Sequence, residues 1–123
     1  MIQLDYKSSR PIYEQIIEQM KYNVMKKYLS PGDAIPSVRK LALELKITPG
    51  TVAKAYQELE RQGVIETIRG KGTFIASEIY IKQDDTKVKA IKKRISSEIL
   101  ELKMMGYDMK QTVELVKNIY DEI

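Results

Sequence analysis

The sequence predicts a mainly α-helical chain with one small β-hairpin, built as an N-terminal domain followed by a two-helix C-terminal tail. Apolar residues recur at helical spacing in several stretches of the 123-residue chain. Two runs rich in β-branched residues, 64–68 and 73–76, flank a short glycine-bearing gap, as the strands of a hairpin do. A polar stretch over residues 78–86 then reads as a linker to the tail.

The first helix is expected over about residues 11–27. Its apolar positions recur every fourth residue, at Ile12, Ile16, Met20 and Val24. Ser9 or Arg10 is expected to cap this helix. Pro11 suits its first position, where a missing N–H costs no hydrogen bond.

A turn signal over residues 31–36 separates this helix from two shorter ones. Ser37 is expected to cap a helix over residues 38–46, and Thr48 to cap a helix that runs to about Gln62. Gly63 is a natural stop. The apolar stripes are Val38, Leu41, Ala42 and Leu45 in the former, and Val52, Ala55 or Tyr56, and Leu59 in the latter. Two helices joined by so short a link have the proportions of a helix-turn-helix.

The gap between the two strands reads "RGKG", residues 69–72, and allows two interpretations. One is a hairpin tip with a type I′ or II′-like turn, in which Gly70 and Gly72 supply positive φ. The other is a phosphate-binding P-loop, which requires Ser or Thr after the lysine and a helix next. Lys71 is followed by Gly72 and a predicted strand. The sequence therefore favours the hairpin.

Two further amphipathic helices are expected, over about residues 87–105 and 109–122, with Asp108 and Gln111 at capping-box spacing. Their stripes are predicted to form a dimerisation surface: Val88, Ile91, Ile95, Ile99, Leu102, Val113, Val116, and Ile119 or Tyr120. Two helices cannot enclose a core alone, and a second copy of the chain would cover both stripes. The alternative is that both helices fold back on their own N-terminal domain.

Composition excludes several classes of function. The chain has no cysteine and no histidine. Disulfides, thiol nucleophiles and zinc sites with such ligands are therefore excluded, and we expect no metal and no cofactor. Carboxylates do not cluster around a nucleophile, so an enzyme is not expected. No apolar run approaches the roughly 20 residues of a membrane span, and the start lacks a signal-peptide layout. We expect a cytoplasmic protein without membrane contact.

The positive charge is unevenly distributed. Residues 1–77 carry 12 lysines and arginines against 8 acidic residues, whereas residues 78–123 carry 9 of each. The net charge of +4 thus belongs to the N-terminal part. This asymmetry indicates a polyanionic partner for one module. The basic run over residues 87–94 is read as a solvated face, with added nonspecific affinity for DNA as the alternative.

In a helix-turn-helix, the start of the second helix enters the major groove of double-stranded DNA. Small or polar residues stand there: Thr48, Gly50, Thr51 and Lys54. Ser37 and Arg39 begin the preceding helix, and Arg69 and Lys71 lie on the hairpin tip. Together these parts predict a winged helix-turn-helix. Each residue also has a structural reading, as a cap or a solvated charge, and an adaptor for protein contacts is the alternative function.

Residues 31–76, "PGDAIPSVRKLALELKITPGTVAKAYQELERQGVIETIRGKGTFIA", resemble the DNA-binding domain of the GntR family of bacterial transcription regulators. The lead-in "RPIYEQI", residues 10–16, resembles it too. The resemblance implies a homodimer on a palindromic operator, with Arg39, Thr51, Lys54 and the wing residues 69–72 near DNA. Pro49 or Gly50, and Ala53, stand where many members carry arginine, so the base-reading side chains are left open.

The "TVAKAY" form and the short tail resemble the YtrA-like branch of that family. This resemblance implies a winged domain over residues 1–77, a linker over 78–86 and a dimerisation region over 87–123. It also implies a regulator, expected to be a repressor, of genes that include a transporter operon. Whether a small-molecule effector binds is left open.

Overall fold

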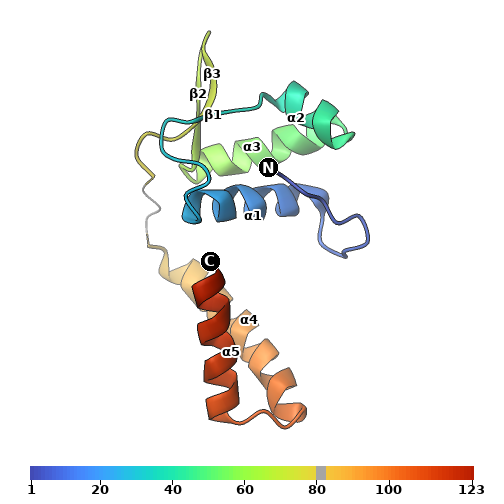
Figure 1. Ribbon diagram of the computed structural model, residues 1–123, viewed down its shortest axis with the longest axis vertical. Helices are drawn as coiled ribbons and strands as arrows, with labels where there is room; N and C mark the ends of the chain where they lie inside the picture. Colours follow the sequence, from blue (N-terminus) through green and yellow to red (C-terminus); the bar gives the residue numbers. More distant parts are fainter. Residues whose placement is uncertain (80–82) are drawn as a thin grey trace. The chain divides into compact units, whose positions relative to one another are not determined.

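The computed structural model describes residues 1–79 and 83–123, which form two compact units (Figure 1). The first unit holds three helices and a small sheet, and the second holds two helices, so the predicted mainly α-helical class with a winged hairpin is confirmed. The elements are α1 (Ile12–Met25), β1 (Ala34–Ile35), α2 (Val38–Leu45), α3 (Pro49–Arg61), β2 (Ile65–Ile68), β3 (Gly72–Ile75), α4 (Asp85–Met104) and α5 (Met109–Glu122).

Helix α1 begins one residue later than predicted. Pro11 precedes the helix with an extended ψ of 145°, and no side chain caps the first turn, so the proposed caps Ser9 and Arg10 are wrong. The buried amide of Gln15 instead ties the N-terminal segment to α1. Its Nε2 donates to the carbonyls of Asp5 and Arg10 at 3.0 Å, and its Oε1 accepts from the Asp5 N–H at 2.9 Å.

Helices α2 and α3 form the predicted helix-turn-helix. The Ser37 hydroxyl oxygen accepts from the Lys40 N–H at 3.1 Å, as expected for a cap. Lys46 ends α2 in the left-handed region with φ of 57°. Pro49 begins α3, and Gly63, with φ of 79°, ends it. The change of chain direction between α2 and α3 therefore comes from the left-handed conformation of Lys46 and the start of α3 at Pro49.

The sheet has three antiparallel strands in the order β1–β3–β2. Ile65 pairs with Ile75 at the base of the hairpin, and Ile68 pairs with Gly72 at its tip. Strand β1 was missed, because the segment before Pro36 was predicted as a turn only. Two residues are too few for an alternating pattern, and this strand exists through its pairing with β3.

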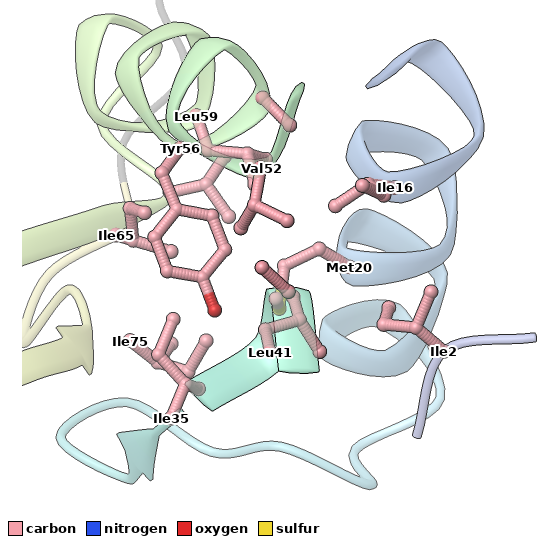
Figure 2. Packing of buried hydrophobic residues seen from close by; sticks show 13 residues of the cluster. Ile2, Ile16, Met20, Ile35, Leu41, Val52, Tyr56, Leu59, Ile65 and Ile75 are labelled. Atoms are coloured by element: carbon pink, nitrogen blue, oxygen red, sulfur yellow. The ribbon is translucent and has the colours of Figure 1, made fainter. Parts of the chain in front are cut away.

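The core of the first unit lies where α1, α2, α3 and the sheet meet (Figure 2). Its side chains include Ile2, Ile16, Met20, Ile35, Leu41, Val52, Tyr56, Leu59, Ile65 and Ile75. Burying one such aliphatic side chain stabilises the fold by about 1.5–3 kcal/mol. The predicted stripes of α1, α2 and α3 therefore supply the packing that fixes α3 against the sheet.

The second unit consists of α4 and α5, and each begins with a capped turn. Asp84 accepts from the N–H groups of Thr86 and Lys87. Asp108 and Gln111 form the predicted capping box, with bonds of 2.8 and 2.9 Å. Helix α4 begins within the predicted linker, part of which, residues 80–82, lies outside the described residues. Across the described ranges, no helix is both long and apolar enough to cross a membrane.

Candidate nucleic-acid interface

The wing tip is a tight turn between β2 and β3, and Figure 1 shows this hairpin projecting beyond the helices of its unit. The Lys71 N–H donates to the Ile68 carbonyl at 2.9 Å. Gly70 has φ of 79°, whereas φ of Arg69 is not positive. These signs fit a type II turn, so the predicted type I′ or II′ turn is wrong. Gly72, with φ of 127°, continues into β3, and both glycines are required by the backbone.

Both cations of the wing tip are exposed. Arg69 and Lys71 stand on either side of Gly70, and neither forms an ion pair with a described carboxylate. A Cβ at Gly70 would meet no atom within 4 Å, so the tip is open on that side. Such a tip can meet phosphate oxygens or enter a narrow minor groove. Because β3 and no helix follows "RGKG", the P-loop alternative is excluded.

Helix α2 contributes two of the predicted residues. The Ser37 oxygen is engaged as the cap of α2, which leaves its hydroxyl hydrogen available to an outside acceptor. Arg39 is the second residue of the helix, is exposed and pairs with no described carboxylate. Both residues therefore offer donors at the start of α2, where backbone N–H groups also favour anions.

At the start of α3, the hydroxyls of Thr48 and Thr51 lie 3.0 Å apart and form a hydrogen bond. Thr48 occupies the N-cap position, but its side chain makes no capping bond, so its predicted capping role is wrong. Gly50 lies between them in the first turn, and a Cβ there would meet nothing within 4 Å. Neither packing nor a positive φ explains this glycine.

Lys54 lies in a groove between α1 and α3. Its Nζ is 3.9 Å from the centroid of the Tyr13 ring, a distance typical of a cation–π contact. The groove has a volume of about 540 Å³. It is lined by Tyr13, Glu14, Ile17, Lys54, Gln57, Glu58, Arg61 and Gln62. Sequence reasoning missed Tyr13, since no spacing rule links side chains of two different helices.

The other end of this groove carries a fixed ion pair. Arg61 donates to both carboxylate oxygens of Glu58, at 2.9 and 2.5 Å, and Gln62 donates to the same carboxylate at 2.8 Å. The hydrogen bonds from Arg61 and Gln62 lower the pKa of Glu58 to about 2. Glu58 is therefore ionised and already occupied at neutral pH, and it forms no ion pair with Lys54.

All the predicted interface residues lie in the first unit. Ser37, Arg39, Thr48, Gly50, Lys54, Arg69, Gly70, Lys71 and Gly72 are exposed, and Thr51 is half-buried. The structure brings Thr48 and Thr51 into contact and places Lys54 against α1. Within the described ranges, acidic side chains do not gather in a group that could hold a metal ion.

The apolar stripes of the tail are open. Val88, Ile95 and Val116 are each 50% exposed, and Tyr120 is 78% exposed. Of the predicted dimerisation residues, Ile91 and Val113 are also exposed, whereas Ile99 and Leu102 are half-buried. Among residues 83–123, Thr112 is the one buried residue. The second unit thus has almost no core of its own.

Comparisons with known proteins agree with this architecture. The model of the family described as bacterial regulatory proteins, gntR family, matches residues 12–75, more than half of the chain. The chain is 43% identical, over its full length, to the HTH-type transcriptional repressor YtrA of Bacillus subtilis (strain 168), of which the match covers 95%.

Two solved structures are similar as well. One is a transcriptional antiterminator from Listeria monocytogenes EGD-e, 38% identical, with a TM-score of 0.85 and with 98% of this chain and 90% of that chain covered. The other is the AraR DNA-binding domain in complex with operator ORX1, 25% identical, with a TM-score of 0.54 and with 62% of this chain and 95% of that chain covered. This chain therefore belongs to the gntR family of bacterial regulatory proteins and is a helix-turn-helix transcriptional regulator, not an enzyme.

Proposed function

We propose that this chain represses transcription by binding a palindromic operator as a homodimer. The observation that carries the proposal is that one unit presents both an exposed start of α3 and a wing tip whose two cations form no ion pair with a described carboxylate, and that this unit matches the family model. The similarity to AraR, whose DNA-binding domain is bound to an operator, supports DNA as the partner. The full-length similarity to a repressor supports the direction of regulation.

In this proposal α3 enters the major groove, and Thr48 and Thr51 are its groups for hydrogen bonds to base edges. The open space around Gly50 lets the helix backbone approach the duplex closely. Ser37, Arg39 and Lys54 contact phosphates, and so does the wing tip, residues 69–72. Phosphate contacts fix the register, whereas the threonines supply sequence preference.

Dimerisation is assigned to the tail, residues 87–123, as an isologous contact between two copies. The support is physical: α4 and α5 expose their apolar stripes, and a helical pair without a core is unstable alone. A second copy would cover Val88, Ile95, Val116 and Tyr120 at once. The winged domain, residues 1–77, and a linker that ends where α4 begins at Asp85 complete this division of the chain.

A repressor acts where the chromosome lies, which places the proposed function in the cytoplasm. The resemblance to the YtrA-like branch makes a transporter operon the expected target, and whether a small-molecule effector binds stays open. With half-sites read by successive α3 helices, their centres should lie about 34 Å apart, or a multiple of that distance.

One experiment tests partner and assembly together. The full chain is used to select its preferred duplex from random DNA, and the mass of the purified complex gives the number of chains per duplex. A palindromic sequence bound by two chains is the expected result. Enrichment of no sequence would contradict operator recognition, and one chain on an asymmetric site would contradict the homodimer.

A further inference from the structure

Lys54 differs from the other cations of the proposed interface because a second helix holds its side chain. Tyr13 lies in the first turn of α1, is half-buried and packs against the hydrophobic core, so its ring is fixed to the body of the domain. The Lys54 Nζ lies 3.9 Å from the centroid of that ring. A residue of α1 therefore orders a cation of α3.

The charges around Lys54 leave it available to an external anion. Glu14 on α1 and Glu58 and Arg61 on α3 line the same groove. Glu58 is engaged by Arg61 and Gln62, and Lys54 forms no ion pair with a described carboxylate. An aromatic face attracts an ammonium group without neutralising it, unlike a carboxylate. Lys54 is thus held in place without being paired to a described carboxylate.

The ordering of the Lys54 side chain has a direct consequence for its binding to a phosphate. A lysine side chain carries much rotamer freedom, and a contact with phosphate requires that freedom to be lost. When the side chain is held before binding, this loss has already occurred. We propose that Tyr13 is a positioning residue for DNA binding, whose ring holds the Lys54 ammonium in the α1–α3 groove for a phosphate of the bound duplex.

This inference rests on the proposed DNA-binding function and makes a narrower claim. In this inference Tyr13 makes no phosphate contact of its own, and among the described residues its phenolic oxygen donates one long hydrogen bond of 3.4 Å to Glu14. The effect of Tyr13 on DNA affinity must therefore pass through Lys54. An aromatic ring without the hydroxyl should serve equally well.

A double-mutant cycle on the full chain tests the inference, with affinity for the selected operator measured across a range of salt concentrations. Lys54→Met should weaken binding and flatten the salt dependence by about 0.9 in slope, the value for one phosphate contact. Tyr13→Leu should weaken binding by about two- to tenfold without changing the slope, because the contact is still made but at a higher ordering cost. The double variant should bind as Lys54→Met does.

Two further variants separate positioning from structure. Tyr13→Phe keeps the ring and should bind nearly as the wild type does. Ile17→Ala shortens another half-buried side chain of the groove without removing the ring, so any loss that it causes should be the same with and without Lys54. Thermal unfolding of every variant identifies the folded fraction used to calculate affinity.

Several results would overturn the inference. Tyr13→Leu could bind as the wild type does, or it could weaken the Lys54→Met variant as much as it weakens the wild type. Equal losses in Tyr13→Phe and Tyr13→Leu would make the phenol a direct contact instead. If the wild type binds no duplex at any salt concentration, the proposed function itself fails. That outcome is distinct from DNA binding without coupling between Tyr13 and Lys54.

Discussion

The phenol of Tyr56 donates a 2.7 Å hydrogen bond to the backbone carbonyl of Pro36. Tyr56 lies in the middle of α3, and Pro36 directly precedes the cap of α2, so this bond joins the proposed recognition helix to the entrance of its neighbour. The Tyr56 ring is buried within the core (Figure 2). One polar contact inside an apolar setting therefore adds to the packing that holds α3 against α2.

Tyr56→Phe should destabilise the fold at neutral pH by about 1 kcal/mol, because a buried hydrogen bond is lost. Burial, followed by the negative charge of Glu44, raises the pKa of Tyr56 to about 12. Between pH 10 and 12 the unfolded phenol releases its proton while the folded one keeps it. Stability therefore falls as pH rises through this window, by on the order of 2 kcal/mol. Urea unfolding at pH 8 and pH 11 measures both effects.

In the Phe variant this alkaline loss should be absent, so the stability difference from the wild type narrows or reverses at pH 11. Tyr28→Phe is the matched control, because Tyr28 is 68% exposed. This variant should leave the free energy of unfolding unchanged at both pH 8 and pH 11. If Tyr56→Phe and the wild type differ by the same free energy of unfolding at pH 8 and at pH 11, the proposed protonated, buried Tyr56 is wrong.

Gly50→Ala should separate folding from DNA binding. Alanine has a higher helix propensity than glycine by up to about 1 kcal/mol. The added Cβ meets nothing within 4 Å, so the unfolding temperature should stay unchanged or rise. Operator affinity should nevertheless fall, by about tenfold for each 1.4 kcal/mol of steric cost against the duplex. Calorimetry and a binding titration on one preparation measure both.

Gly70→Ala provides the contrast, because Gly70 has φ of 79° and alanine there costs about 1–2 kcal/mol of backbone strain. Its stability should fall. If Gly50→Ala binds the operator as tightly as the wild type does, the proposal that the backbone of α3 approaches DNA closely at Gly50 is wrong.

The features that the sequence predicted correctly are local ones. Caps and stops depend on residues near each other in the chain, and so Ser37, Gly63 and the Asp108–Gln111 box were predicted correctly. The hairpin followed from two β-branched runs around paired glycines. Each of these signals is local, and local geometry is what propensity and spacing encode.

The features that escaped prediction are contacts between distant residues. Strand β1 depends on Phe74 and Thr73, about forty residues away in the chain. The Tyr13–Lys54 contact joins two helices. The Thr48 hydroxyl forms its hydrogen bond with the Thr51 hydroxyl and not with a backbone N–H of the first turn, because a side-chain partner competes with the backbone. Spacing placed Tyr13 and Lys54 on the correct helices but gave no information on their contact, and it predicted the residues of β1 as a turn.

Lys71→Ala should weaken binding to operator and random duplexes alike. Its side chain is exposed on the wing tip and pairs with no described carboxylate, which suits a phosphate contact that carries no sequence information. The slope of log affinity against log salt should flatten by about 0.9. Lys110→Ala, which removes an exposed lysine of the tail, is the control and should leave the slope unchanged. An unchanged slope in Lys71→Ala would remove this residue from the interface.

Ile95→Asp should convert the proposed dimer into monomers. Ile95 is 50% exposed in one copy, and a second copy would bury it beside the other stripe residues of α4 and α5. A carboxylate at the centre of such an apolar contact would be desolvated without a partner, and that cost outweighs the contact itself. Sedimentation equilibrium gives the molar mass, and circular dichroism over a dilution series shows whether the tail helices require the second copy.

The control is Ala90→Asp on the same helix. Ala90 is also exposed, but it lies outside the apolar stripe, so this variant should remain dimeric despite its added charge. Operator affinity should fall only in Ile95→Asp, since monomers lose the joint engagement of two half-sites. A wild-type chain that is monomeric at micromolar concentration would favour the alternative, in which the tail folds back on its own winged domain. Ile95→Asp would then destabilise that single chain without any change in its mass.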